Sequence, residues 1–236
     1  MIYLAIFLAT IIAIAILVWL FRKKSYEKTA YFAATRTPYR VLWRDKGLLG
    51  EYMTFRYLRK LSGYKKFLFN CYIPKEDGTL TEIDLILLHK SGVYVFESKN
   101  YGGWIFGNEA SRNWTQTFRN GHKERFLNPI KQNENHIKHL LCFLPGLPAQ
   151  AVHSVIVFSE RCELRKITLT TGRHIVIKRN EVLRTVSRRA KTNILSQANI
   201  DAIYQRLYPQ TQLSAQAKEA HRQRVANITA ERRRPS

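Results

Sequence analysis

The chain begins with an unbroken apolar run and continues with shorter segments in which apolar and polar positions alternate. Residues 2–21 contain Thr10 as their only clearly polar side chain and no charged residue. At a helical rise of about 1.5 Å per residue, this run is long enough to cross the hydrocarbon layer of a bilayer. We therefore expect a single transmembrane helix that contacts the lipid bilayer through residues 2–21.

A cleaved signal peptide is the competing explanation for this run. Signal peptides carry basic residues before a shorter apolar core, which a cleavage site with small residues follows. Here the basic residues Arg22, Lys23 and Lys24 come after the apolar run. Because cationic flanks stay in the cytoplasm, we expect a single-pass protein of the cytoplasmic (inner) membrane with its N-terminus outside and its remaining chain inside.

Residues 47–61 form the first amphipathic segment. Leu48, Phe55 and Leu58 recur at helical spacing, which predicts a helix. Glu51 falls on the same stripe, three residues after Leu48 and four before Phe55. A carboxylate in that position is either a functional group or a partly exposed side chain at the edge of the apolar face.

Short apolar segments alternate with segments of helical period along the middle of the chain. Asp77-Gly78 is a hairpin signal, and Asn128-Pro129 is the typical start of a helix. This alternation predicts an α/β (α+β) domain. The predicted strands cover residues 67–73, 81–88, 93–99, 104–106, 114–119, 152–158 and 175–177, and the predicted helices cover 128–143, 180–186 and 194–208.

These elements suggest four regions along the chain. We expect a transmembrane anchor at residues 1–21, a basic juxtamembrane linker at 22–44, a folded domain at 45–190, and a C-terminal helix with a basic tail at 191–236.

The charge balance narrows the choice of partners. The chain has 39 Lys and Arg residues against 17 Asp and Glu residues, a formal net charge of +22. Such a balance favours polyanions, either nucleic acid or an anionic membrane surface. Contact of the basic linker with anionic lipid is therefore one expectation. The 3 cysteines include no CxxC pair, which argues against a disulfide framework and a Cys-based zinc module.

Charged residues interrupt two of the predicted strands. Asp84 lies in strand 81–88, and Glu97 and Lys99 end strand 93–99. Burying such charges without partners is costly, so their position indicates a site for a cation, a phosphate or both. Strand alternation places Glu97 and Lys99 on one face, where they form either part of a site or a simple salt bridge.

These residue types suit a hard divalent cation. Carboxylates at Asp84 and Glu97, joined by Glu51 from the preceding helix, are ligands that Mg²⁺ or Mn²⁺ prefers. A divalent ion there could polarise a phosphodiester and generate hydroxide from water. Lys99 could orient that water or stabilise the charge that develops on the phosphate.

Two glutamines and two histidines are weaker candidates. Gln116 and Gln132 could each position a phosphate or a water, or could be plain surface amides. His136 and His139 lie three residues apart on the helix 128–143, a spacing that can ligate zinc. Because no Cys or acid joins them at ligand spacing, we expect these histidines to be surface or partly buried helix residues.

Several of these residues belong to segments that resemble one protein family, the nuclease-related domain (NERD) family. Ser98 departs mildly from that family's pattern, in which a threonine is commoner between the glutamate and the lysine. The resemblance covers roughly residues 47–144. The segments that carry it are Gly47-Leu48-Leu49-Gly50-Glu51, Thr81-Glu82-Ile83-Asp84, Val95-Phe96-Glu97-Ser98-Lys99-Asn100-Tyr101-Gly102-Gly103, Trp114-Thr115-Gln116 and Asn128-Pro129-Ile130-Lys131-Gln132-Asn133.

This resemblance implies similarity to the restriction-endonuclease-like proteins of the PD-(D/E)xK superfamily. It implies a central mixed sheet flanked by helices and Mg²⁺-dependent cleavage of DNA. The site residues that it implies are Lys99, Glu97, Asp84, Glu51, Gln116 and Gln132, with Lys99 as the catalytic lysine and Asp84, Glu97 and Glu51 as the metal ligands.

Three functions remain open at the level of the sequence. The first is a membrane-anchored, divalent-metal-dependent nuclease that hydrolyses phosphodiester bonds in DNA. The second is a catalytically inactive module that binds or tethers nucleic acid at the cytoplasmic face of the membrane. The third is a membrane-surface protein whose basic segments bind lipid and whose domain binds another protein.

Overall fold

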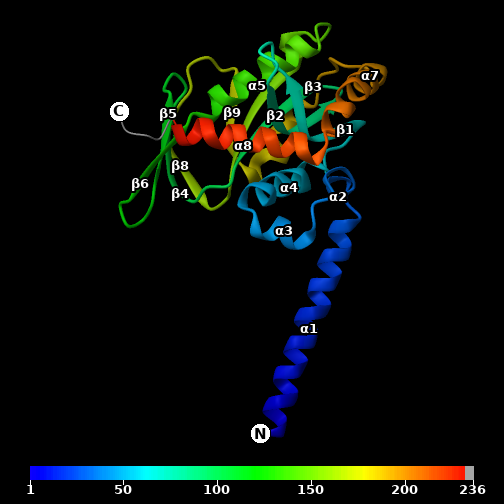
Figure 1. Ribbon diagram of the computed structural model, residues 1–236, viewed down its shortest axis with the longest axis vertical. Coiled ribbons are helices and arrows are strands. Elements are labelled where there is room, and N and C mark those ends of the chain that lie inside the picture. The colour runs from blue at the N-terminus through cyan, green and yellow to red at the C-terminus, as the bar shows by residue number, and fades with distance from the viewer. Residues whose placement is uncertain (232–236) are drawn as a thin grey trace.

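A long N-terminal helix projects from a globular part that contains two β-sheets (Figure 1). The computed structural model describes residues 1–231, so residues 232–236 of the expected basic tail lie outside the described residues. The first helix, α1 (Ile2–Glu27), exposes the apolar side chains of its N-terminal part. Within the described range it is the one helix long and apolar enough to cross a membrane, a test that a signal sequence also passes.

The larger sheet has five strands in the order β1-β2-β3-β7-β9. The first three strands, β1 (Lys65–Pro74), β2 (Leu80–His89) and β3 (Gly92–Lys99), pair antiparallel through two consecutive hairpins. The strands β7 (Val152–Phe158) and β9 (His174–Lys178) extend the sheet in parallel with β3. The sheet is mixed, as the family resemblance implied.

Helices cover both faces of this sheet. The helices α4 (Lys46–Leu58) and α6 (Val182–Arg189) bury apolar side chains against one face. The helices α5 (Pro129–Phe143) and α7 (Gln197–Leu207) cover the other face. This confirms the predicted fold class, in which helices flank a mixed sheet.

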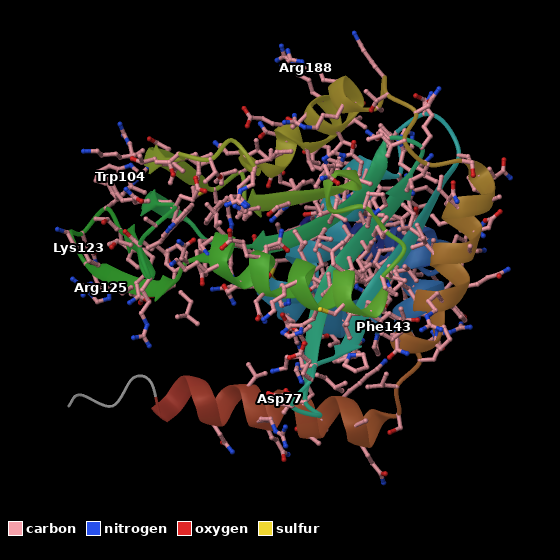
Figure 2. All side chains as sticks on the ribbon, turned by 90° about the horizontal axis from the view of Figure 1, so that it is seen from above. Asp77, Trp104, Lys123, Arg125, Phe143 and Arg188 are labelled. Carbon is pink, nitrogen blue, oxygen red and sulfur yellow. The ribbon has the colours of Figure 1, made fainter. Side chains whose placement is uncertain are left out.

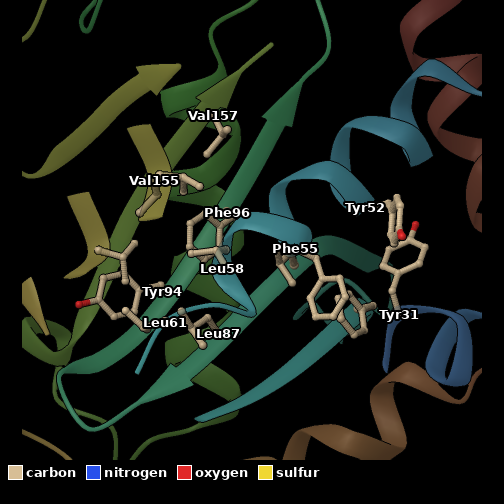
Figure 3. Packing of buried hydrophobic residues seen from close by; sticks show 14 of the residues in the cluster. Tyr31, Tyr52, Phe55, Leu58, Leu61, Leu87, Tyr94, Phe96, Val155 and Val157 are labelled. Carbon is tan, nitrogen blue, oxygen red and sulfur yellow. The ribbon is translucent and has the colours of Figure 1, made fainter. Parts of the chain in front are cut away.

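Aromatic side chains fill the core beneath α4 (Figure 3). The ring of Phe55 lies 5.2 Å from that of Phe69 on β1, measured between centroids. The ring of Tyr31 lies 5.0 Å from Phe69 and 5.4 Å from Tyr52. Such clusters of buried rings add packing energy to the burial of apolar surface. The rings of Tyr52 and Phe55, which follow Glu51 on α4, hold this helix against the sheet.

Residues 22–44, expected as a linker, are helical and packed against the domain. Helix α1 continues past Arg22 to Glu27, and α2 (Ala30–Thr35) and α3 (Tyr39–Arg44) follow. The apolar residues of this range are scattered among cations, so its pattern did not predict a buried element. The side chains that enter the core are Tyr26, Tyr31, Tyr39 and Leu42.

A second sheet of four strands, in the order β6-β5-β4-β8, extends from one end of the globular part (Figure 1). Figure 2 shows Lys123 and Arg125 of its β5–β6 hairpin at the periphery. The sequence did not predict β6 and β8, because their mostly exposed side chains give no apolar run. The strands are β4 (Gly103–Asn108), β5 (Asn113–Thr117), β6 (Lys123–Leu127) and β8 (Cys162–Thr168).

Short 3-10 turns and a final helix complete the chain. The turns are η1 (Ala149–Ala151), η2 (Arg179–Glu181) and η3 (Tyr208–Thr211). The last helix, α8 (Ala215–Glu231), places His221 close to β2, where its Nε2 lies 3.9 Å from Glu82 Oε2.

Gly92 closes the β2–β3 hairpin in a backbone conformation that other residues rarely adopt. Its φ is +130°, and a Cβ atom there would lie 2.3 Å from the carbonyl oxygen of Ala151. We expect Gly92→Ala to lower the free energy of unfolding by more than about 2 kcal/mol, measured by urea denaturation. Gly78→Ala is the matched control, because Gly78 also has a positive φ but no atom within 4 Å of an added Cβ. An equal loss in both variants would contradict this expectation.

Candidate active site

Asp84 and Glu97 lie where β2 and β3 separate from each other. The ladder between the two strands extends as far as Leu85 and Phe96, and the two acids are the next residue on each strand. Beyond this point β3 pairs with β7, whereas β2 remains paired with β1. The fork leaves space between the strands, into which both carboxylates can project.

The alternation of side chains reverses at the same level of the sheet. Asn70 of β1 has a φ of +49°, a left-handed conformation inside a strand. Phe69 packs in the core beneath α4, whereas Cys71, two residues later, packs in the core beneath α5. The β1–β2 register places Asn70 opposite Asp84. Asp84 therefore sits where a regular alternation of faces no longer holds, and the sequence pattern could not assign its face.

Glu97 is at the centre of a chain of polar contacts. Its Oε1 lies 2.7 Å from Lys99 Nζ, and its Oε2 lies 3.3 Å from His136 Nε2. The hydroxyl oxygen of Thr81 lies 2.7 Å from the other ring nitrogen, His136 Nδ1. Since an ionised carboxylate only accepts hydrogen bonds, His136 donates through Nε2–H to Glu97. The glutamate is thus fixed from two sides.

These contacts decide the charge states of the pair. Burial alone would raise the pKa of Glu97, but Lys99 and His136 outweigh burial and lower it to about 2. Burial alone would lower the pKa of Lys99, but the Glu97 carboxylate outweighs it and raises that pKa. Both groups are therefore charged at neutral pH, although Glu97 is only 5% exposed.

The carboxyl groups of Asp84 and Glu51 have fewer partners that stabilise their ionised forms. Burial, together with the charge of Glu97, raises the pKa of Asp84 to about 7. Burial and the charge of Asp84 raise the pKa of Glu51 well above its usual range. The Tyr31 hydroxyl donates a hydrogen bond of 3.4 Å to Glu51 Oε2. The charge of Asp84 thus opposes ionisation of Glu51, and the charge of Glu97 opposes ionisation of Asp84. A bound cation would relieve that repulsion.

A cavity of about 850 Å³ opens beside the fork, and both Asp84 and Glu97 line it. Its other walls come from β2, from α5 with the loops before it, and from α8. Three cations, Lys75, Arg112 and Lys131, face the same cavity. A third acid, Glu82, lines the cavity beside Asp84 and Glu97. Cations around a group of acids suit a substrate that is itself a polyanion and binds together with a metal ion.

The N-terminus of α5 forms part of the cavity wall. Asn128 caps the helix by accepting a hydrogen bond of 2.9 Å from the backbone N–H of Ile130. Its side-chain amide also donates to the carbonyls of Glu109 and Ser111, at 2.9 and 2.7 Å. This network anchors the start of the helix, so that Gln132 one turn later faces the cavity.

The two predicted glutamines have different environments. Gln132 lines the cavity, and its buried Oε1 has no hydrogen-bond partner among the described residues. Gln116 is buried on β5, where its Nε2 donates a hydrogen bond of 2.8 Å to the carbonyl of Gly102. Like Glu51 and Lys99, it is not among the residues that line the cavity. Gln116 therefore stabilises the turn that follows Lys99 rather than facing the acids.

The donor set partly fits a divalent cation. Among the described residues, no group of three or more His, Cys, Asp or Glu side chains lies close enough to hold a metal ion. Asp84 and Glu97 are nevertheless near enough to perturb each other, and Gln132 Oε1 has no partner. Mg²⁺ commonly uses one or two carboxylates and completes its shell with waters and substrate phosphates. Two carboxylates beside an open cavity fit that requirement.

Three residues of the site were missed or undervalued in the sequence. His136 is partly buried, as expected, but it contacts Glu97. Thr81 contacts His136, and Tyr31 contacts Glu51. His136 follows Gln132 by four residues, which places both on one face of α5. That spacing could have linked the histidine to the site. Thr81 lies in one of the segments that carry the family resemblance, although no contact with His136 was predicted, and no sequence signal indicated Tyr31.

Comparison with known proteins identifies the family of this part of the chain. Residues 46–159 match the model of the nuclease-related domain family. These residues form a nuclease-related domain. The predicted resemblance is confirmed, and a place in the PD-(D/E)xK superfamily is consistent with it.

The chain is also similar to a bacterial protein. An uncharacterised protein of Bacillus anthracis is 35% identical over 144 residues, which cover 60% of this chain. The match spans 66% of that protein, just under two thirds of its length. No solved structure matches the chain. The nuclease-related domain contains all six predicted site residues, Glu51, Asp84, Glu97, Lys99, Gln116 and Gln132.

Proposed function

We propose that the chain is a membrane-anchored nuclease that hydrolyses phosphodiester bonds in DNA with the help of Mg²⁺ or Mn²⁺. The observation that supports this most strongly is the buried ion pair of Glu97 and Lys99. Glu97 and its neighbour Asp84 line a cavity that cations also line, and Lys99 lies directly behind Glu97. If the ion pair were only structural, neither the neighbouring acid Asp84 nor an open cavity beside it would be required. The nuclease-related domain family makes phosphodiester hydrolysis the most direct use of this arrangement.

Lys99 is the proposed catalytic lysine. Its Nζ is held 2.7 Å from Glu97 Oε1, which keeps the ammonium charged and fixed in position. A fixed cation can stabilise the negative charge that develops on the phosphate, because little reorganisation is required. The same ammonium can orient a water for attack on phosphorus.

Asp84 and Glu97 are the proposed ligands of the divalent ion, and Glu51 is the third acid of the site. When bound, the ion supplies a Lewis acid that polarises the phosphate and lowers the pKa of a bound water. His136 contacts Oε2 of Glu97 and so fixes the orientation of this carboxylate. Gln132 offers an unpaired carbonyl oxygen to a water or to the substrate.

The cations of the cavity are the proposed contacts to the DNA backbone. Lys131 belongs to the first turn of α5, where the helix dipole adds to its attraction for phosphate. Arg112 precedes β5, and Lys75 follows β1, so the cations approach from different elements. They favour a substrate that extends across the cavity.

The continuity of α1 supports an anchor rather than a cleaved signal. The helix continues from the apolar run through Arg22 to Glu27, and Tyr26 is buried in the core of the domain. A retained helix is therefore part of the folded structure. The cations that follow the run favour an orientation with the domain in the cytoplasm.

A cleavage assay tests the proposed function. The full-length protein in detergent is incubated with supercoiled and linear DNA, single-stranded DNA and RNA, each with Mg²⁺, Mn²⁺ or EDTA. We expect metal-dependent nicking or cutting of DNA that EDTA abolishes. Absence of turnover on every substrate with both metals would contradict the proposal.

A second candidate function is a module that binds or tethers nucleic acid without cutting it. The observation that favours it is the engagement of both Glu97 oxygens by Lys99 and His136, which leaves the carboxylate without a vacant oxygen. Binding to DNA would then fall steeply with salt and survive replacement of both Asp84 and Glu97 by alanine. Binding without cleavage by the unaltered protein would support this function over the first.

His136 offers a test of how Glu97 is positioned. We expect His136→Ala to reduce the cleavage rate about tenfold, because Glu97 loses one of the contacts that orient it. The measurement is the cleavage rate across a range of metal concentrations. His139→Ala on the same helix is the control and should leave the rate unchanged, since His139 does not line the cavity. Equal effects of the two substitutions would contradict a positioning role.

A further inference from the structure

A second cavity lies at the junction between α1 and the globular part. It has a volume of about 430 Å³ and is bounded by the end of α1, by α3 and by α4. Three arginines face it: Arg22 from α1, Arg56 from α4 and Arg59, which caps the C-terminus of α4. This cavity shares no lining residue with the candidate active site.

The charge of this cavity is uncompensated. In the described part of the chain, the arginines that form ion pairs are Arg165 and Arg179, not the three that face this cavity. Burial raises the pKa of Tyr52 in the cavity wall, and the charges of Arg56 and Arg59 act against that increase. The guanidinium groups therefore set a positive potential inside the cavity, which favours an anion.

The cavity lies at the level where the apolar part of α1 ends. Phe21, the last residue of the apolar run, lines it beside Arg22. The Trp19 ring contacts Tyr39 of α3 at 6.1 Å between centroids, and Arg40 lies 5.7 Å from the Trp19 centroid. Tryptophan and arginine in this combination are typical of the boundary between hydrocarbon and headgroups.

Helix α3 presents apolar side chains on the same side. Val41 is 46% exposed and Trp43 is 45% exposed, and Trp43 also lines the cavity. Figure 1 shows α3 on the side of the globular part from which α1 projects. With α1 in a bilayer, these two side chains would meet the membrane surface, and the cavity would open at the depth of the lipid phosphates.

We propose that this cavity binds the headgroup phosphate of an anionic phospholipid. The proposal assumes that α1 spans the membrane, and it is independent of nuclease activity. Guanidinium groups bind phosphate through paired hydrogen bonds, and about 300–1,000 Å³ is the usual size of a small-ligand site. Phe21 and Trp43 at its rim suit the glycerol and acyl portions of a lipid. Nucleic acid lacks such apolar portions, so a lipid is the better fit.

Lipid retention by the full-length protein tests this site. The protein is purified in a neutral detergent, and dioleoyl phosphatidylglycerol or dioleoyl phosphatidylcholine is added before native mass spectrometry. We expect phosphatidylglycerol to be retained roughly tenfold better than phosphatidylcholine. Arg56→Gln combined with Arg59→Gln should abolish this preference. Arg44→Gln combined with Lys60→Gln removes the same charge outside the cavity and should preserve it.

Several outcomes would overturn the proposal. They are equal retention of both lipids by the unaltered protein, undiminished preference in the Arg56 and Arg59 double variant, and an equal loss in the control. Displacement of the lipid by millimolar inorganic phosphate or by a short DNA duplex would assign the site to those anions instead. If the double variant fails to fold, Arg22→Gln alone must lower the preference several-fold, or the proposal is wrong.

Discussion

Replacing Lys99 by alanine in the full-length protein is expected to reduce metal-dependent DNA cleavage by at least about 10²-fold. The substitution removes the ammonium that is fixed 2.7 Å from Glu97 Oε1, and it leaves the carboxylate of Glu97 without its closest partner. The measurement is the initial rate of nicking of supercoiled DNA with Mg²⁺ and with Mn²⁺, at saturating protein.

The control for Lys99→Ala is Lys138→Ala on the exposed surface of α5. It removes the same charge outside the cavity, so its cleavage rate should equal that of the unaltered protein. DNA binding should persist in both variants, because Lys75, Arg112 and Lys131 remain. Cleavage by Lys99→Ala at the rate of Lys138→Ala would exclude a catalytic role for the lysine.

Replacing Asp84 by asparagine is expected to abolish cleavage while making the metal-free protein more stable. The folded state raises the pKa of this carboxyl to about 7, so the ionised form is disfavoured there relative to the unfolded chain. Stability is therefore lost as the pH rises from the usual range of an aspartate through 7. A neutral amide removes that cost, by on the order of 1–3 kcal/mol at pH 8 and almost nothing at pH 4.

Urea denaturation in EDTA at pH 8 and pH 4 measures the difference. Asp201→Asn is the matched control, because Tyr64 and Lys66 stabilise the ionised form of Asp201 and lower its pKa. That substitution should reduce stability at pH 8, the opposite sign. An Asp84→Asn variant that is less stable than the unaltered protein at pH 8 would show that the site does not store repulsion between acids.

Much of the central fold was predictable because its strands are continuous apolar runs. The hairpin at Asp77-Gly78 and the cap at Asn128 were also recognised, since turn and cap chemistry is local. The edge strands β6 and β8 were not, because their side chains face solvent and carry no periodic apolar signal. Helices α2 and α3 were missed for a different reason: each is 6 residues long and is held mainly by tertiary contacts.

The candidate site shows a similar division. The acids, the lysine and Gln132 were found from charged or polar residues in apolar segments and from the resemblance to a family. The contact of His136 with Glu97 depends on how α5 lies over β3, which strand and helix periods do not specify. The environment of Gln116 depends on the turn at Gly102, which a sequence motif cannot describe. Long-range packing therefore determines which predicted residues share the cavity.

The helical connection between α1 and α4 has a geometric consequence for any substrate. Tyr26 near the C-terminal end of α1 and Tyr31 of α2 are both buried in the core. Tyr31 also contacts Glu51 directly. With a flexible linker, the domain and its cavity could adopt many orientations relative to the membrane. A packed connection instead fixes the height and tilt of the cavity, so DNA would have to approach the bilayer at a set angle.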